Sequence, residues 1–481
     1  MKEIIKKMNL LMVILFGLLL ASCNSNTKKK AIVETDENGY ALLTDEQVEN
    51  IVRRSYQYVA MYNVNNKFAA SPKTNFTTGG WNKGLTNTEL LDHTVNAIAR
   101  PNNDNLYQAA MLDLQHDAVV FKFPAINSKY VSLMITGYDH YVNIPLSTIY
   151  GDFDKPTTML IYSSRTKGYE GEPVEGIDHI FEATCDFVSV VMRVMPHAVE
   201  QERYDQIVEQ INAIEGMSLS EYKGGEAIRT PEVNFPAIGE TDADIFENNL
   251  LEVMQFVFNH TTFDENNAMD RAVLAAYEEL GIMPGHNFDS NTAVKINGKK
   301  FRTMADKIKE ESLALMLDPS MMELLGPKMF QPKGKTDLKT IVALSVIGPI
   351  GQPMDQAMYR PVNVADGSVM NAQNDYVIRM TKEEMPPALA FWSVTLYDQK
   401  NGFFIPNDYK KYSVGENAGF KLNEEGGIEI HVAAGRPAGV PLENWLPVNR
   451  EDQNLDVILR IYAPDLEKMK TWKAPVAEKI N

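Results

Sequence analysis

Ala390-Phe391-Trp392-Ser393-Val394-Thr395-Leu396-Tyr397-Asp398 is the stretch of sequence that decides the fold. Successive side chains of a β-strand point to opposite faces. One face would carry Trp392, Val394 and Leu396, and the other would carry Phe391, Ser393, Thr395 and Tyr397. The first face is fully apolar and is predicted to belong to a hydrophobic core. The second face mixes rings with hydroxyls, so it either packs in the core, as aromatic strands commonly do, or lines a cavity.

Comparable strand patterns lie on both sides of a helical middle segment. Apolar residues with a period of two, separated by turn residues, recur over residues 118–192 and again over residues 376–462. Short strands with regular turns are typical of β-sandwiches and jelly rolls. Residues 198–317 instead repeat apolar residues at helical spacing. The sequence therefore predicts an α+β, mainly β fold, in which two β-sandwich-like or jelly-roll-like domains are joined by a helical middle segment.

The chain is expected to divide into five segments. A helix should begin directly after Thr44, because Thr44-Asp45-Glu46 is a typical helix start. The segments are a signal peptide at residues 1–22, a lipidated tether at residues 23–44, an N-terminal β domain at residues 45–200, a helical bridge at residues 201–350 and a C-terminal β domain at residues 351–481.

The N-terminus has the pattern of an export signal. Met1–Lys7 is basic, and the apolar run at residues 10–20 is shorter than the roughly 20 residues that span a bilayer. Leu20-Ala21-Ser22-Cys23 resembles the lipobox of bacterial lipoproteins, in which the chain is cut before the cysteine and the thiol is acylated. The alternative is an ordinary signal peptide that happens to contain a cysteine.

Lipidation of Cys23 would anchor the chain to a membrane, since each buried methylene contributes about 0.8 kcal/mol. No acidic run follows Cys23, which favours a periplasm-facing location on the outer membrane of a Gram-negative bacterium. The second of the two cysteines, Cys185, is expected to be a buried packing residue. No intrachain disulfide is then possible, and the fold must be held by packing alone.

Composition and missing motifs exclude several functions. A net charge of −18 repels nucleic acid, so no nucleic-acid partner is expected. The chain contains no G-x-S-x-G, H-E-x-x-H, Walker or G-x-G-x-x-G motif. His197 and Glu200 have a spacing that could hold a metal, but a solvated helix face is the simpler interpretation. No metal and no cofactor are predicted, and the oligomeric state is left open.

A second informative stretch is Ala99-Arg100-Pro101-Asn102-Asn103-Asp104-Asn105-Leu106-Tyr107. Its Asn and Asp side chains are costly to bury without partners. One interpretation is a set of Asx-turns, in which these side chains bond their own backbone. The other is the floor of a polar pocket, with Arg100 and Asp104 presenting charge to a ligand.

These two stretches resemble two paired bacterial domains of unknown function. Residues 75–200 are similar to the domain of unknown function 1254, through Arg100–Tyr107 and the following Leu112-Asp113-Leu114. Residues 355–475 are similar to the domain of unknown function 1214, through Phe391–Asp398, Asn407, Tyr412-Ser413, Asn444-Trp445-Leu446-Pro447, Leu459-Arg460-Ile461-Tyr462 and Trp472-Lys473-Ala474-Pro475. The chain departs from the family pattern at Asn105, Lys411 and Gly426-Gly427. The resemblance implies two β domains joined by helices and carries no settled activity.

The favoured function is that of an exported envelope lipoprotein that binds a small polar or glycan-like ligand between the two β domains. The candidate ligand-binding residues are Arg100, Asn102, Asn103, Asp104, Tyr107, Asp139, Trp392, Tyr397 and Asp398. The alternative is a hydrolase of a small ester or an envelope polymer, with Asp104 or Asp139 as general base and Arg100 or His140 stabilising negative charge. In an extended strand Asp139 and His140 would point to opposite faces, which counts against their acting as a pair.

Overall fold

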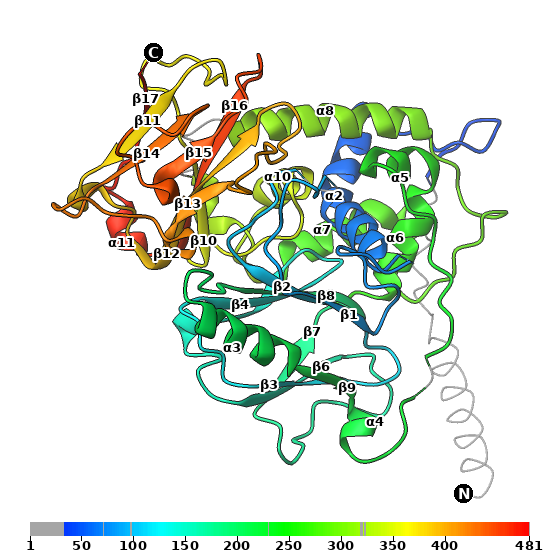
Figure 1. Cartoon of the computed structure of the whole chain (residues 1–481). Coiled ribbons are helices and arrows are strands. Elements are labelled where there is room, and N and C mark those ends of the chain that lie inside the picture. Colours follow the sequence, from blue (N-terminus) through cyan, green and yellow to red (C-terminus); the bar gives the residue numbers. More distant parts are fainter. Residues whose placement is uncertain are drawn as a thin grey trace, which may run out of the picture.

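The computed structural model describes residues 33–70, 72–96, 99–228, 230–317, 321 and 324–480. The predicted signal peptide and Cys23 lie outside these residues. Figure 1 shows three parts: sheets formed by residues 83–218, a group of helices, and sheets formed by residues 357–479. The predicted order of β, then helical, then β structure is confirmed.

The N-terminal β domain contains two sheets. The five-stranded sheet has the order β1-β2-β8-β4-β5 and is antiparallel throughout. The four-stranded sheet has the order β7-β6-β3-β9, in which β6 and β7 are parallel. The strands are β1 (Lys83–Asn87), β2 (Leu106–Asp113), β3 (Val119–Phe123), β4 (Val131–Gly137), β5 (Val142–Ser147), β6 (Thr157–Ser163), β7 (His179–Ala183), β8 (Phe187–Val194) and β9 (Glu215–Ser218).

The C-terminal β domain also contains two sheets, with the orders β10-β16-β12-β13 and β15-β14-β11-β17. Their strands are β10 (Ala357–Pro361), β11 (Tyr376–Met380), β12 (Ala388–Asp398), β13 (Ser413–Gly415), β14 (Ile428–Ala433), β15 (Trp445–Pro447), β16 (Leu455–Pro464) and β17 (Ala477–Lys479). Trp392, Val394 and Leu396 pack into the core between these sheets, as their shared face predicts.

Five helices form a group around α2 (Asp45–Phe68), which contacts α5 to α8 and α10, whereas α3, α4 and α11 lie beside the β domains. Thr44 starts α2 through a capping box with Gln47, so the predicted helix start is confirmed. The other helices are α3 (Gln201–Asn212), α4 (Leu219–Tyr222), α5 (Asp242–Asn248), α6 (Leu250–Asn259), α7 (Ala268–Glu278), α8 (Gly298–Leu317), α10 (Leu338–Ile347) and α11 (Leu466–Met469). Short 3-10 turns are η1 (Thr148–Tyr150), η2 (Gly326–Lys328), η3 (Lys382–Glu384), η4 (Glu416–Ala418) and η5 (Leu442–Asn444).

The turn after β4 joins the five-stranded sheet to the helices. Gln57 of α2 donates a hydrogen bond to the Asp139 carbonyl (2.8 Å). The Nδ1 atom of His140 lies 3.0 Å from the Ser345 hydroxyl of α10. His140 has a φ of +63° and is 2% exposed. Burial lowers the pKa of His140 to about 4, so the folded protein holds this imidazole neutral.

This buried histidine should make the protein sensitive to mild acid. Below a pH of about 6.5 the His140 side chain is protonated in the unfolded chain but stays neutral in the folded protein. The free energy of unfolding should therefore fall as the pH drops towards 4. One proton contributes a slope of about 1.4 kcal/mol per pH unit.

His140→Asn should make this slope shallower by about that amount, because asparagine does not titrate. Asparagine also tolerates the positive φ at this position. Urea unfolding between about pH 4.5 and 7.5 measures this slope. His286→Asn, at an exposed position, is the control, and equal slopes for both variants would contradict the prediction.

Candidate functional site

The mixed face of β12 lies against the N-terminal β domain. We call the residues at this contact the interdomain layer. It consists of Asn102, Asn103, Asp104, Tyr107, Tyr130, Ser132, Arg193, Gln352, Tyr359, Phe391, Ser393, Tyr397, Arg460 and Tyr462, which are linked by the hydrogen bonds, ring contacts and charge interactions given below. Ser393 and Tyr397 thus occupy the face that sequence analysis separated from the core.

Asp104 connects the two β domains at the centre of this layer. Its carboxylate accepts hydrogen bonds from the hydroxyls of Ser393 (2.5 Å) and Tyr462 (3.0 Å). Its backbone carbonyl accepts one from Asn417 (3.1 Å). Burial raises the pKa of Asp104, while the positive charge of Arg460 and the two hydroxyls act in the opposite direction. A single buried carboxylate therefore serves both domains.

The polar stretch before β2 forms an Asx-turn, as one interpretation of the sequence predicts, and it also contacts the other β domain. The Asn102 side chain accepts the Asp104 N–H (2.7 Å), which is an Asx-turn. The same side chain donates to the Tyr462 hydroxyl of the C-terminal domain (2.6 Å). The Asn103 side-chain oxygen is buried and has no hydrogen-bond partner among the described residues. Local turn chemistry thus holds polar groups at a domain boundary.

Two buried arginines come from the middle strands of the facing sheets. Arg460 of β16 is 3% exposed, and its guanidinium lies 5.7 Å from the ring centre of Tyr359 and 5.4 Å from that of Tyr397. One of its nitrogens donates to the Arg100 carbonyl (3.1 Å). Arg193 of β8 is 8% exposed and lies 5.9 Å from the ring centre of Tyr107, its neighbour on β2. Both guanidiniums keep nitrogens that have no hydrogen-bond partner in the described part of the chain.

Aromatic rings close one side of the layer. Phe391 and Tyr462 stack with their ring centres 4.1 Å apart. Tyr130 contacts both of them edge-on. The Tyr130 hydroxyl and Ser132 both donate to the Gln352 side-chain oxygen, at 3.0 Å and 2.9 Å. These rings lower the local dielectric, which strengthens the electrostatic interactions of the charged groups beside them.

The structure brings together Asn102, Asn103, Asp104, Tyr107 and Tyr397 of the candidate residues, with Arg100 at the edge, where it pairs with Asp456 (2.6 Å). It places three others elsewhere. Trp392 stacks on Phe420 in the C-terminal core, at a ring distance of 5.0 Å. Asp398 accepts backbone N–H groups of its own turn, from Asn401 and Phe403. Asp139 faces Lys333 at the helical side of the N-terminal domain.

Sequence reasoning missed Arg193 and Arg460. Each is a charged residue inside an otherwise apolar strand, in Val190-Val191-Met192-Arg193-Val194 and in Val457-Ile458-Leu459-Arg460-Ile461. A charge is costly to bury unless it has a specific partner. That exception to the strand pattern is the feature from which both residues could have been found.

Asp139 belongs to a second buried cluster. Lys333 lies 2.7 Å from Asp270 and 3.9 Å from Asp139. Burial raises the pKa of Asp139, and the Lys333 charge opposes this shift. Burial also raises the pKa of the Cys185 thiol, which keeps it protonated and unreactive, in line with the predicted packing role. Because His140 contacts Ser345 instead, Asp139 and His140 do not form an acid–base pair.

His197 and Glu200 contact each other at the start of α3. The His197 Nδ1 atom lies 3.4 Å from the Glu200 carboxylate, and its Nε2 atom accepts the Lys129 N–H (3.1 Å). Both ring nitrogens are therefore engaged within the protein. Among the described residues, no group of three or more His, Cys, Asp or Glu side chains is arranged to hold a metal ion.

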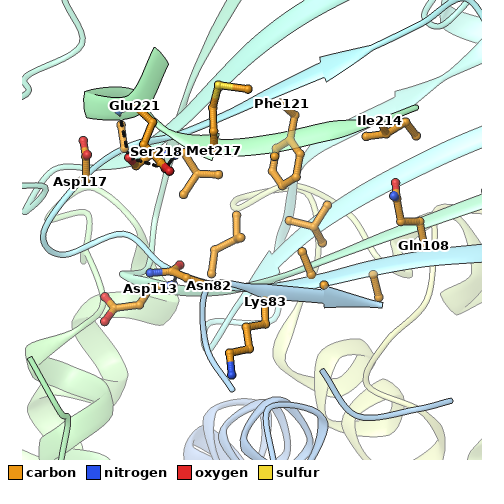
Figure 2. A pocket seen from close by; sticks show the side chains of 18 of the residues that line it. Asn82, Lys83, Gln108, Asp113, Asp117, Phe121, Ile214, Met217, Ser218 and Glu221 are labelled. Carbon is orange, nitrogen blue, oxygen red and sulfur yellow. Dashed lines mark hydrogen bonds between the residues drawn. The ribbon is translucent and has the colours of Figure 1, made fainter. Parts of the chain in front are cut away.

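A cavity of about 590 Å³ lies between the two sheets of the N-terminal domain, within the size range of small-molecule sites. Figure 2 shows Phe121 over its middle, Asp117, Ser218 and Glu221 at one end, and Ile214 and Gln108 towards the other. The apolar lining includes Leu85, Val119, Leu133, Val190, Met192 and Met217. Ser218 and Glu221 already bond each other in the α4 helix cap. Sequence analysis did not predict this cavity.

Two family models match parts of the chain. The family model described as Protein of unknown function (DUF1254) matches residues 81–215, and the one described as Protein of unknown function (DUF1214) matches residues 356–466. The two matches follow each other in the predicted order, so the predicted resemblance to both domains is confirmed. No curated protein matches the chain.

Two solved structures match the chain, and the first of them shares its fold. The VPA0106 protein from Vibrio parahaemolyticus is 19% identical, with a TM-score of 0.65 over 90% of this chain and 100% of that one. An uncharacterized protein from Burkholderia cenocepacia is 12% identical, with a TM-score of 0.39 over 90% of this chain and 92% of that one. Within the described residues, no helix combines the length and the apolar character needed to cross a bilayer.

Asp104→Asn should destabilise the protein. An asparagine keeps the size of the side chain but loses the charge that the two hydroxyls and Arg460 interact with. The free energy of unfolding should fall by about 2 kcal/mol, the range of a buried charge-assisted hydrogen bond. Chemical denaturation measures the change. Asp154→Asn, at an exposed position, serves as the control and should change stability by less than about 0.5 kcal/mol. Unchanged stability of Asp104→Asn would show that the carboxylate does not join the domains.

Proposed function

We propose that this protein is an exported envelope lipoprotein, held on the periplasmic side of an outer membrane through lipid on Cys23, that binds a small polar or glycan-like ligand between its two β domains. The export and anchoring part rests on the basic start, the apolar run and the Leu20-Ala21-Ser22-Cys23 pattern. The ligand-binding part rests on the interdomain layer.

The observation that carries the proposal is that the interdomain layer contains buried polar groups to which no described residue offers a hydrogen bond. They include atoms of Asn103, Arg193, Gln352 and Arg460. Buried polar groups are normally hydrogen-bonded, and leaving several unpaired destabilises a fold. A ligand with several hydrogen-bonding groups would satisfy them. Aromatic rings beside them, such as Tyr359 and Tyr107, offer flat apolar faces of the kind that sugar-like molecules pack on.

The alternative proposal is a hydrolase of a small ester or an envelope polymer. The 2.5 Å contact between the Ser393 hydroxyl and the Asp104 carboxylate is the feature that favours it, since a carboxylate can accept a serine proton. Against it, Asp104 is 1% exposed and is held by a second hydroxyl. An activity panel of small esters and glycan fragments, run beside the binding experiment below, distinguishes the two proposals.

A binding screen tests the location of the ligand. A ligand that binds the folded state raises the free energy of unfolding, by about 2.7 kcal/mol at 100 times its Kd. The melting temperature rises as a result. We expect a hit among sugars and small polar metabolites. Tyr359→Ala should weaken that hit severalfold, because Tyr359 is 49% exposed and borders Arg460.

Tyr409→Ala is the matched control for this screen. Tyr409 is also an exposed tyrosine of the C-terminal domain, at 59%, but it packs on Trp445 away from the layer. Binding should be unchanged in this variant. An empty screen accompanied by turnover of esters would refute the binding proposal, and equal losses in the two tyrosine variants would refute its location.

The anchor is tested by cysteine substitution in the bacterium. Cys23→Ser should remove the acylated sulfur and shift the protein from the membrane fraction to the soluble fraction. Cys185→Ala should stay in the membrane fraction, because Cys185 is buried. Mass spectrometry of the mature wild-type protein should find acyl chains on Cys23 and no Met1. An unmodified Cys23 would overturn the proposed location.

A further inference from the structure

The interdomain layer has an excess of positive charge. It contains two guanidiniums, from Arg193 and Arg460, and one carboxylate, from Asp104. Neither arginine forms a salt bridge with any carboxylate of the described residues. The exposed pair of Arg100 and Asp456 at the edge is neutral in sum. Because low exposure prevents water from screening these groups, the unbalanced charge favours an anion in the layer.

The unpaired atoms in the layer are largely hydrogen-bond donors. Among the described residues, the unpaired donors are Nη1 of Arg193, Nε and Nη1 of Arg460, and Nε2 of Gln352, and the one unpaired acceptor of the layer is Oδ1 of Asn103. All four nitrogens carry hydrogens and none can accept a hydrogen bond. A neutral sugar hydroxyl both donates and accepts, whereas a carboxylate or phosphate oxygen only accepts. The type of unpaired atom therefore selects for anionic oxygen.

The two arginines are positioned to act on one region. The Arg193 guanidinium lies 5.9 Å from the ring centre of Tyr107. The charges of Arg193 and Arg460 both oppose the rise that burial causes in the pKa of Tyr107, so both lie near this residue. Gln352 reaches the same region, because its side-chain oxygen bonds Ser132, the neighbour of Arg193 on β4. Tyr359, half-exposed and stacked on Arg460, marks the side where this region meets solvent.

We infer that the ligand bound between the two β domains carries a carboxylate or phosphate group, and that Arg193, Arg460 and Gln352 bind it. This inference rests on the proposed function and specifies the chemical class of its ligand. The planar guanidinium fork matches two oxygens of a carboxylate or phosphate, which explains why both positions hold arginine.

Calorimetric titration of the full chain tests the charge class. The probes are inorganic phosphate, succinate and succinamide, the last of which keeps the carbon skeleton of succinate without its charges. Ionic strength is held constant with sodium chloride, because screening weakens such binding. We expect phosphate or succinate to bind at one site per chain and succinamide to bind at least about tenfold more weakly.

Variants assign the binding to the layer. Arg193→Gln should weaken anion binding by about tenfold or more, and Arg193→Lys, which keeps the charge but loses the fork, should have an intermediate effect. Arg379→Gln is the matched control, since Arg379 is exposed and paired with Glu429 and Glu478 on another sheet. Asp104 bonds Ser393 and Tyr462, and Arg193 makes no hydrogen bond to it, so Arg193→Gln should leave the domain contact intact. Arg460→Gln is the second variant. If it fails to fold, Arg193→Gln still tests the inference.

The outcomes separate this inference from the proposed function. Binding of an anion that is lost in Arg193→Gln and kept in Arg379→Gln supports the inference. Binding of neutral ligands that depends on Tyr359, with no anion binding, overturns the charge class and leaves the proposed function standing. Anion binding that is equal in both arginine variants also overturns the inference. Absence of binding by any probe or any ligand of the screen overturns both.

Discussion

The fold depends on one buried carboxylate that is shared by two domains. Asp104 accepts the hydroxyl of Ser393, a residue 289 positions later in the chain, and that of Tyr462. A buried anion tolerates few arrangements, because every oxygen without a donor destabilises the folded state. This contact therefore fixes how the outer face of the five-stranded sheet meets the mixed face of β12. The exposed ion pairs at the edge, Arg100 with Asp456 and Lys129 with Glu416, contribute little by comparison.

Two buried charged clusters in this chain show opposite balances. At the helical side, Lys333 stands between Asp270 and Asp139, so one base faces two acids. Burial raises the pKa of Asp139 there, which allows the cluster to reduce its charge by holding a proton. In the interdomain layer two arginines face one acid, and a guanidinium cannot release its proton in the accessible pH range. An excess of acid is relieved by protonation, but an excess of arginine is relieved only by another anion or by water. The two clusters are similarly buried, but only the one with excess arginine requires an additional anion or water to balance its charge.

The sequence predicted whatever depends on neighbouring residues along the chain. Alternation along β12 separated the core face of Trp392 from the face of Ser393, and the capping pattern located the start of α2 at Thr44. The order of β and helical segments followed from periodicity. Cross-strand neighbours did not follow, because the pairing of β8 with β2 sets Arg193 beside Tyr107 across 86 residues of loops and strands. β1, with the sequence Lys-Gly-Leu-Thr-Asn, has too little apolar alternation to be predicted as a strand. Trp392 is a candidate by residue type, but the alternation of β12 assigns it to the core. The structure shows that strand geometry, not residue type, decides its position.

The five-stranded sheet separates two environments of different chemistry. Met192 and Arg193 are consecutive residues of β8, so their side chains point to opposite faces. Met192 lines the cavity between the N-terminal sheets, and Arg193 lies in the interdomain layer. Leu133 and Ser132 divide in the same way on β4. A shift of one residue in the register of β8 would bring Arg193 into the apolar cavity and Met192 against Gln352, which is unfavourable on both faces at once. The contrast between the two faces therefore strongly specifies the pairing of this sheet, and the same residues that set the register form the polar layer between the domains.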